Sequence, residues 1–197
     1  MPKRFTTQMY LYMLPLSATF PEENSGKTII HTPTHDGGLE HTAAAFDDAK
    51  NWLARTQKGE VVLFPPQCYL LHLVSQFVTG PLADGADAEG HYQRQRDALM
   101  GFIQKVPTAE GNHATSQIPW AEKAMSPTSL FVRKADKRVV LGLDKPGPEL
   151  KETGRGGDWE RVVLVKFTKE AGPQGVEVRR REEVLREERE EAREGKL

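Results

Sequence analysis

The stretch GEVVLFPPQCYLLHLVSQFV at residues 59–78 constrains the fold more than any other part of the chain. Val61–Phe64 is a continuous apolar run of strand length, and the apolar residues after Pro65 and Pro66 are typical of a helix that is buried on nearly all sides. Prolines suit the first turn of a helix, because the N–H groups there have no partner within the helix. The sequence therefore predicts a buried strand that leads directly into a core helix.

The size and charge of the chain limit its class. A chain of 197 residues fits one domain with a small extension, and 27 basic residues against 28 acidic ones give a net charge of −1. This balance argues against binding to a nucleic-acid polymer or to a membrane surface. Cys68 is the only cysteine, which excludes an intrachain disulfide and fits an intracellular, reducing compartment. No apolar run approaches the roughly 20 residues that span a bilayer.

The first part of the chain mixes strand and loop patterns. Arg4–Leu14 is rich in aromatic and β-branched residues and predicts a strand, and a brief strand is expected at Thr28–His31 within a long Gly/Pro loop. Leu39–Phe46 fits a strand, although its three alanines also permit a helix. Asp47 is the expected cap of a following helix, which Gly59 ends.

The second part of the chain predicts helix first and strands afterwards. A helix is expected from His91 to Val106, where Pro107 ends it. The residues at 181–196 are almost entirely Arg and Glu and predict a solvated helix. The fold class is therefore α+β. Four strands joined by short Gly- and Pro-containing turns, and hence antiparallel, are expected at Leu130–Arg133, Arg138–Leu143, Trp159–Thr168 and Val176–Arg180.

Four blocks of the sequence together resemble one group of Nudix hydrolases, the fungal relatives of the peroxisomal Nudix acyl-CoA diphosphatase. The blocks are PKRFTTQMYLYMLP, DGGLEHTAAAF with the following WL, GEVVLFPPQCYLLHLVSQF, and VVLGLDKPGPEL with GDWERVVLVKF, in that order along about three quarters of the chain. The resemblance implies an incomplete Nudix α/β/α sandwich followed by a small antiparallel β-sheet extension. It also implies metal-dependent hydrolysis of diphosphate linkages, with a nucleotide-diphosphate small molecule such as coenzyme A or an acyl-CoA as substrate.

The Nudix box itself has no counterpart in this sequence. In the family, carboxylates one turn apart on a helix gather Mg²⁺ or Mn²⁺, which activates a water for attack on phosphorus. In the family, the box comes before the strand that Arg4–Leu14 resembles. In this sequence, no box precedes residue 4. The stretch REEREEAREG has Arg186-Glu187 and Glu190-Glu191, but Glu188 and Arg193 stand where the box needs an apolar residue and a glycine. We therefore expect a solvated charged helix there, no catalytic residue carried over, and no metal bound by this chain.

These observations suggest a division of the chain into four parts. Residues 1–80 are expected to form the post-box part of a Nudix domain, 81–127 a helix and linker, 128–180 the antiparallel β extension, and 181–197 a charged C-terminal helix or tail. Without the box the chain alone is expected to be inactive, as a shortened gene product or one that lacks its first exons. The alternative is a non-enzymatic binding or interaction module. A third possibility is an unstable translation product, in which the loss of a central strand and helix exposes apolar faces in the region 44–78 and promotes aggregation.

Three residues are candidates for a substrate pocket. Glu40 lies on a strand that, by resemblance, runs near the active cleft, although a solvent-facing strand residue is the alternative. Gln67 could donate a hydrogen bond and Tyr69 could stack on a substrate, or the Pro-Pro-Gln junction simply sets the angle between strand and helix. Cys68 fits a buried core thiol better than a reactive one. His31 and His35 lie in a Gly/Pro loop and fit loop polarity better than a metal site.

The last three residues bear on the compartment. Gly195-Lys196-Leu197 approximates the Ser-Lys-Leu peroxisomal address, with a frayed tail as the alternative. The peroxisome, the cytoplasm and the mitochondrion therefore all fit the sequence, and the oligomeric state is left open by it.

Overall fold

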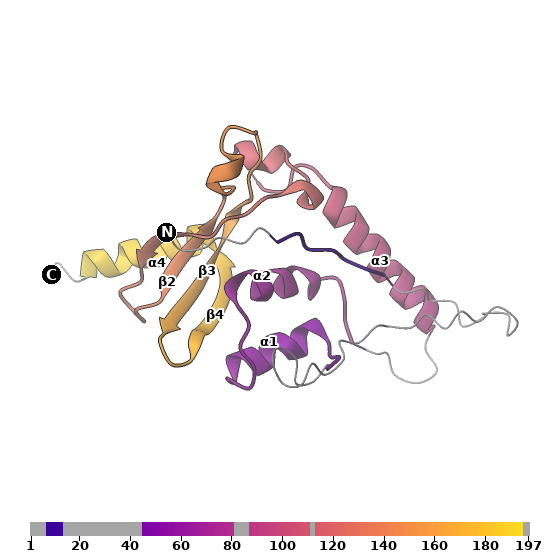
Figure 1. Ribbon diagram of the computed structural model, residues 1–197, viewed down its shortest axis with the longest axis horizontal. Coiled ribbons are helices and arrows are strands. Elements are labelled where there is room, and N and C mark those ends of the chain that lie inside the picture. The colour runs from indigo at the N-terminus through magenta and orange to yellow at the C-terminus, as the bar shows by residue number, and fades with distance from the viewer. Residues whose placement is uncertain (1–6, 14–44, 81–86, 111–112, 195–197) are drawn as a thin grey trace, which may run out of the picture.

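A four-stranded antiparallel sheet in the order β1-β2-β3-β4 lies at the centre of the computed structural model, which describes residues 7–13, 45–80, 87–110 and 113–194 (Figure 1). Helices α1 and α2 pack on one face and α4 on the other, so the α+β class is confirmed. Short 3-10 turns η2 (Ala114–Gln117), η3 (Trp120–Glu122) and η4 (Pro148–Leu150) fill the connections. The helices are α1 (Ala49–Gln57), α2 (Pro65–Val74), α3 (Ala88–Gln104) and α4 (Arg181–Glu194), and the strands are β1 (Thr128–Val132), β2 (Val139–Leu143), β3 (Asp158–Thr168) and β4 (Gly172–Arg180).

The sheet forms where the sequence predicts it. All four expected strands are present, each paired antiparallel with its neighbour along the chain. β4 begins at Gly172, four residues earlier than expected, because the turn is tighter than the GPQG pattern suggests and the pairing starts at Thr168 opposite Gly172. Gly172 has a φ of +67°, a conformation that suits glycine in a tight hairpin. Short local turns therefore fix the topology of the sheet.

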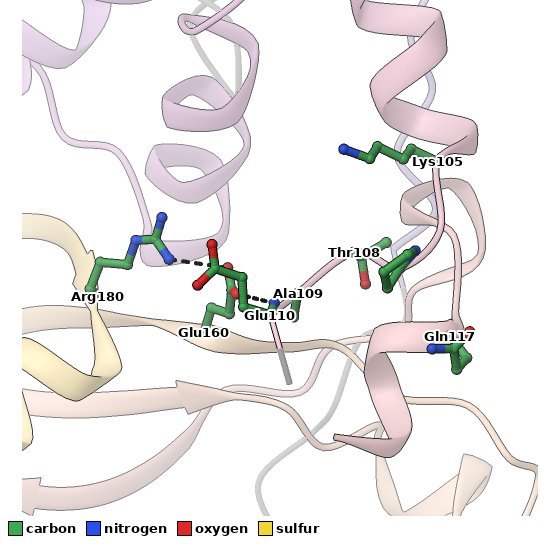
Figure 2. Close-up of a pocket in the computed structure, with 8 residues that line it drawn as sticks. Lys105, Thr108, Ala109, Glu110, Gln117, Glu160 and Arg180 are labelled. Atoms are coloured by element: carbon green, nitrogen blue, oxygen red, sulfur yellow. Dashed lines mark hydrogen bonds and ion pairs between the residues drawn. The ribbon is translucent and has the colours of Figure 1, made fainter. Parts of the chain in front are cut away.

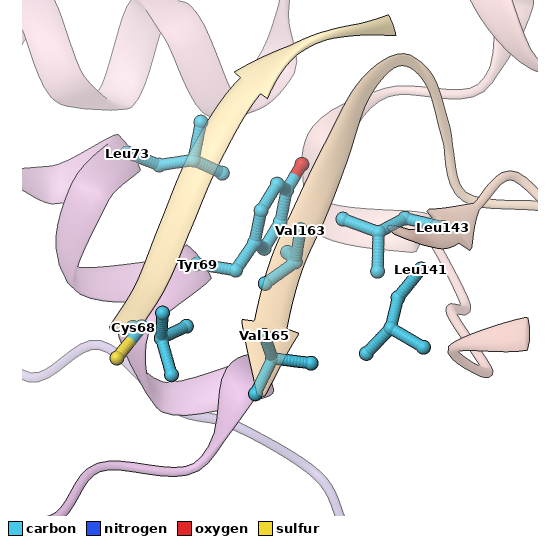
Figure 3. Packing of buried hydrophobic residues seen from close by; sticks show 8 residues of the cluster. Cys68, Tyr69, Leu73, Leu141, Leu143, Val163 and Val165 are labelled. Carbon is cyan, nitrogen blue, oxygen red and sulfur yellow. The ribbon is translucent and has the colours of Figure 1, made fainter. Parts of the chain in front are cut away.

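The alternation of side chains along the strands divides the core into two clusters. On one face, β2, β3 and β4 pack against the buried face of α2, as Figure 3 shows for Cys68, Tyr69 and Leu73. On the other face, Val140, Val162 and Leu164 pack against Val184 of α4. Each such aliphatic side chain contributes about 1.5–3 kcal/mol when fully buried. The α2 helix, from the segment expected to be post-box, therefore shares one core with strands of the expected β extension.

The expected strand at Val61–Phe64 is wrong. The segment is extended, with φ −73° and ψ 155° at Phe64, but it pairs with no described strand. Leu63 packs toward the core, whereas the side chains of Val62 and Phe64 are 57% and 58% exposed. A continuous apolar run alone cannot make a strand, because a strand also needs a neighbour for its N–H and C=O groups. The helix that the two prolines predict is confirmed, with Pro65 and Pro66 in its first turn.

The described part of the expected strand at Arg4–Leu14 is also not a strand. Residues 7–13 pair with none of the described strands, and Met9 to Tyr12 are exposed. The rest of this segment, the brief strand expected at Thr28–His31 and most of Leu39–Phe46 lie outside the described residues. Residues 7–13 are not a strand for the same reason as Val61–Phe64: residues that favour strands form one only when a partner strand pairs with their backbone.

The helix boundaries need two small corrections. The N-cap of α1 is Asp48, whereas Asp47 accepts hydrogen bonds from the Asp48 N–H at 2.8 Å and the Asn51 amide at 2.7 Å. Gly59 has a φ of +75° just beyond the end of α1, which confirms it as a terminator. The α3 helix ends at Gln104, because Lys105 is already extended. Among the described helices, none combines the length and the apolarity that a membrane span requires.

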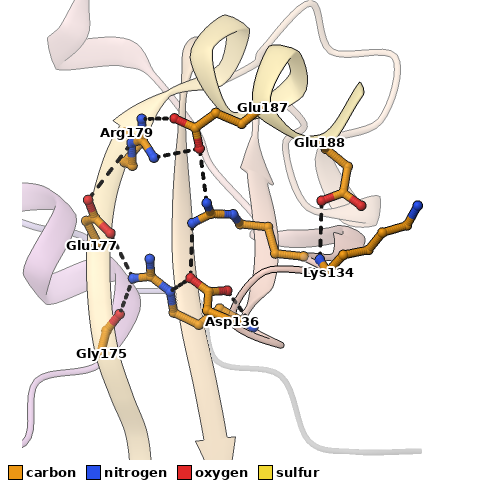
Figure 4. Close-up of polar contacts among 9 residues, drawn as sticks. Lys134, Asp136, Gly175, Glu177, Arg179, Glu187 and Glu188 are labelled. Carbon is orange, nitrogen blue, oxygen red and sulfur yellow. Dashed lines mark hydrogen bonds and ion pairs between the residues drawn. The ribbon is translucent and has the colours of Figure 1, made fainter. Parts of the chain in front are cut away.

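The charged C-terminal helix is docked on the sheet rather than fully solvated, which corrects the expectation. Val184 is buried in the core, and the Glu187 carboxylate accepts hydrogen bonds from Arg179 at 2.7 and 3.0 Å and from Arg133 at 3.0 Å (Figure 4). The hydrogen bonds from Arg179 lower the pKa of Glu187. Glu188 also accepts the Lys134 N–H, at 3.3 Å. The helix is therefore held on the sheet by one buried apolar residue and several ion pairs, and not by a continuous apolar stripe.

Two glycines provide a matched test of this packing. A Cβ on Gly157, the residue before β3, would collide with the Leu143 carbonyl oxygen and the Met125 side chain, whereas one on Gly101 in α3 would meet nothing within 4 Å. We expect Gly157→Ala to lower the free energy of unfolding by about 1–3 kcal/mol through overpacking. Gly101→Ala should raise it by about 0.5–1 kcal/mol through helix propensity. Urea denaturation of both variants checks this, and equal effects of the two changes would contradict the described packing.

Candidate functional site

A buried hydrogen bond joins α2 to the start of β3. The Tyr69 hydroxyl donates to Oδ2 of Asp158 at 2.8 Å, across 89 positions of sequence. The two residues are only 2% and 1% exposed. Pro65 and Pro66 start α2 so that Tyr69 falls on its sheet-facing side, and Gly157 brings the chain close to β2 just before Asp158. Local sequence at both ends therefore positions this contact.

The Asp158 carboxylate is fully engaged. Its Oδ1 accepts the Glu160 N–H at 2.9 Å, and its Oδ2 also accepts a hydrogen bond from Nη1 of Arg161 at 3.2 Å. A buried carboxylate is tolerated only when such partners replace water. Asp158 therefore acts as a node that fixes α2, the first residues of β3 and the Arg161 guanidinium together.

Burial has a strong effect on the two titratable side chains of α2 that face the sheet. It raises the pKa of Tyr69 well above its ordinary value of 10.0, and the neighbouring Asp158 charge acts in the same direction. Burial also raises the pKa of the Cys68 thiol to about 11. The Cys68 thiol lies 3.7 Å from the Leu63 carbonyl oxygen. Both groups are therefore neutral at pH 7, and Cys68 is the buried core thiol that the sequence favours.

Ion pairs lead from the buried node to the surface. Glu160 lies next to Asp158 in β3, and its carboxylate lies 3.8 Å from Nη1 of Arg161 and 3.4 Å from Nη1 of Arg180. It also accepts the Glu110 N–H at 2.6 Å. These ion-paired side chains line two surface cavities, and Arg180 lines both of them.

The larger cavity, of about 630 Å³, lies between the end of α3 and the sheet (Figure 2). The Lys105 side chain reaches over it from one side and Arg180 from the other, with Thr108 and Glu110 between them. Its lining consists of polar side chains and short apolar ones, namely Lys105, Pro107, Thr108, Ala109, Glu110, Gln117, Glu160 and Arg180. It is an open polar trough.

The smaller cavity, of about 340 Å³, lies between α2 and β4. Burial, with a smaller effect from the Arg161 charge, lowers the pKa of its His72. Nε2 of His72 lies 3.1 Å from the amide nitrogen of Gln76. The cavity is lined by His72, Gln76, Arg161, Glu177, Val178, Arg179, Arg180 and Glu183.

The charges balance in the larger cavity, where Lys105 and Arg180 stand against Glu110 and Glu160. The smaller cavity has three guanidinium groups against two carboxylates, because Arg180 lines it as well. Each guanidinium of the two linings lies within ion-pair distance of a carboxylate. The cationic members are Lys105, Arg161, Arg179 and Arg180, and the acidic ones are Glu110, Glu160, Glu177 and Glu183.

The described side chains can be tested for a site that fits Mg²⁺ or Mn²⁺. Within residues 7–13, 45–80, 87–110 and 113–194, no group of three His, Cys, Asp or Glu side chains is arranged to hold a metal ion. Within the box-like stretch at 186–195, the carboxylate of Glu187 is engaged by Arg179 and Arg133.

The structure places two of the three candidate pocket residues. Gln67 is exposed, and its side-chain oxygen accepts the Phe64 N–H at 2.9 Å, so it caps the start of α2. Tyr69 is in the core and bound to Asp158. Glu40, with His31 and His35, lies outside the described residues. The two placed residues are on one helix, but they do not meet in a cavity, and the substrate-pocket assignment of all three stays a prediction.

Sequence reasoning missed the residues that organise this junction: Asp158, Glu160, Arg161 and Arg180. A signal was present, because Asp158 stands directly between Gly156-Gly157 and the apolar run of β3, with Arg161 three residues later. A carboxylate at the entry to a fully buried strand needs a partner in the core. Tyr69 is the hydroxyl-bearing residue of the core helix and was the partner to look for.

Comparison of the chain with protein-family models, with curated proteins and with solved structures finds no match.

Removing one hydroxyl tests the buried node. Tyr69→Phe keeps the ring but leaves Asp158 with one donor fewer in the core, so we expect the free energy of unfolding to fall by about 1–3 kcal/mol. Tyr92→Phe is the matched control, since the hydroxyl of Tyr92 bonds to none of the described residues and the change should be neutral. Chemical denaturation measures both, and an unchanged stability of Tyr69→Phe would contradict the role of the contact.

The pKa of Tyr69 predicts a loss of stability in alkali. Above pH 10 the unfolded chain releases the phenol proton while the folded chain keeps it, because the folded pKa is raised. Proton release then favours unfolding, so the free energy of unfolding should fall as pH rises from 10. The Tyr69→Phe variant should lose this part of the slope. Denaturation curves between pH 9 and pH 11 check it, and parallel slopes for variant and wild type would argue against it.

Proposed function

We propose that this chain is a non-enzymatic protein–protein interaction module derived from a Nudix-like domain. The supporting observation is the extended segment at residues 61–64, which leaves Val62 and Phe64 57% and 58% exposed. Large apolar side chains on an extended, unpaired segment are typical of a surface that another strand completes. The sequence predicted such exposed apolar faces in this region if a central strand and helix are missing.

The physical basis is the cost of unpaired backbone groups next to apolar side chains. In residues 61–64 the segment is held in place on one side by Leu63 in the core and at its end by the Gln67 cap on Phe64. The N–H and C=O of Phe64 are already bonded, to Gln67 and to the Cys68 N–H, so a partner strand would pair with the extended backbone before Phe64, with little further loss of entropy. Backbone hydrogen bonds supply affinity in this mode, and the side chains of Val62 and Phe64 supply specificity.

The enzymatic alternative rests on the resemblance alone. By that resemblance the family reaction is metal-dependent hydrolysis of a nucleotide-type diphosphate, with coenzyme A or acyl-CoA as the substrate class and the peroxisome as a compartment. The larger cavity has no excess positive charge to favour a diphosphate, and Glu183 and Glu187 of α4 are paired with arginines. The interaction role therefore has the stronger support.

A hydrolysis assay separates the two classes. We expect the purified 197-residue chain, incubated with coenzyme A and Mg²⁺ or Mn²⁺, to release no phosphopantetheine above the rate of a buffer blank. Liquid chromatography with mass detection follows the product. Release at rates ordinary for the family, roughly 1 s⁻¹ or more, would refute the non-enzymatic assignment.

A second experiment addresses the interaction surface directly. A partner that completes residues 61–64 should co-purify at fixed stoichiometry with the wild type, and the Val62→Ser/Phe64→Ser variant should lose it. Met100→Ser is the control, because Met100 is also exposed, at 41%, but lies on α3, away from α2 in the chain. Light scattering of the purified material gives the stoichiometry. Equal retention by both variants would contradict a role for this segment.

A further inference from the structure

The two edges of the sheet differ in how well they are protected. The β4 edge carries Pro173 and the charged residues Glu177 and Arg179, and α1 and α2 pack against it. The β1 edge reads Thr-Ser-Leu-Phe-Val, without a charged residue, and Leu130 and Val132 are exposed. Natural proteins protect edge strands with charges, prolines, bulges or covering elements. Among the described residues, β1 has a bulge between Ser129 and Phe131 and the α4 helix near its end, but no charge and no proline.

Backbone geometry leaves the end of β1 open for pairing. The Arg133 N–H donates to the Arg138 carbonyl at 2.8 Å, so the backbone groups of Arg133 point toward the neighbouring strand. Backbone groups alternate in direction along an antiparallel strand. The N–H and C=O of Val132 therefore point outward, and the bulge lies behind them rather than at this end.

The α4 helix extends over this edge. Glu187 binds Arg133 and Glu188 accepts the Lys134 N–H, so the helix has reached the end of β1 by its second turn. Figure 1 shows the remaining turns running on past the sheet. These turns carry Glu190, Glu191 and Glu194 against two arginines. A strand added to β1 would lie beneath an acidic helix end.

The same chain carries a segment that matches this edge. Residues 7–13, TQMYLYM, are uncharged, as β1 is, and Met9 to Tyr12 are exposed and unpaired with any described strand. The residue types are those that strands favour. Lys3 and Arg4 precede the segment in the sequence, with a sign opposite to that of the acidic end of α4.

We propose that residues 7–13 of one copy add as a strand to the free β1 edge of a second copy, beneath the projecting end of α4, and that two copies exchange this strand reciprocally. This rests on the proposed interaction role and names a second copy of this chain as a partner. Reciprocal exchange is a recognised route to symmetric dimers. The four tyrosines contributed by two segments would bury on the order of 600–1,000 Å². With the surfaces they cover, this reaches the roughly 1,200 Å² of the smallest stable interfaces.

Sedimentation equilibrium of the full chain tests the proposal. The wild-type mass should rise from one chain to two with concentration. Val132→Lys at the acceptor edge and Tyr10→Lys in the donor segment should each weaken the dimer about tenfold or more. Phe167→Lys is the matched control, because Phe167 is 55% exposed and Val132 is 54% exposed, and it should dimerise as the wild type does. Thermal melts confirm that each variant is folded.

Hydrogen exchange identifies the segments that pair. Amides of β1 and of residues 7–13 should gain protection with increasing concentration in the wild type and in Phe167→Lys only. A monomeric wild type at all concentrations would overturn the proposal, and so would a dimer that Val132→Lys leaves intact. After either result, the proposed interaction role still holds if the Val62→Ser/Phe64→Ser variant loses a different partner. Hydrolysis of coenzyme A by the chain would instead contradict the proposed function itself.

Discussion

The hydrogen bond from Tyr69 to Asp158 is the constraint on which the rest of the structure depends. It is the polar contact that fixes α2 in register against β3, in a core otherwise made of aliphatic side chains that could slide. Asp158 in turn orients Arg161, and Arg161 and Arg180 flank Glu160. Glu160 and Arg180 line the larger cavity, and Arg161 and Arg180 line the smaller one. The hydrogen bonds to Asp158 also explain why its carboxylate is stable in the interior.

The second face of the sheet is covered by α4, which is held there mainly by ion pairs. The α4 helix has almost no apolar surface, and Val184 is its main hydrophobic contribution. Its orientation is instead set by Glu187, which binds Arg179 of β4 and Arg133 just after β1, and by the stacking of the Arg181 guanidinium 4.0 Å from the Trp159 ring centroid. Several partly buried charge pairs acting together hold the helix where a single exposed pair would contribute little. The direction that they give α4 is what carries its end past β1.

Sequence reasoning succeeded where structure is set by neighbours in the chain. The hairpins from Thr128 to Arg180 and the start of α2 at Pro65 were predictable, because turn residues and prolines act locally. The segments at 7–13 and 61–64 have the composition of strands, but pairing is a non-local property that no local pattern guarantees.

The candidate site was largely beyond prediction for the same reason. Tyr69 was recognised as a residue of interest, yet its partner lies 89 positions away. Asp158 could have been flagged as a buried carboxylate, but nothing local indicated which residue would satisfy it. The docking of α4 was missed because ion pairs, unlike an apolar stripe, leave no periodic pattern. The features of the junction are therefore mostly products of tertiary packing.

Native-state hydrogen exchange of α2 and β3 tests the central claim most directly. If the Tyr69–Asp158 contact makes the helical layer and the sheet one cooperative unit, amides of α2 and of β3 should open with the same free energy, equal to that of global unfolding. Exchange from α2 at a clearly lower free energy than from β3 would mean that the helices detach from an independently stable sheet, and would contradict the account.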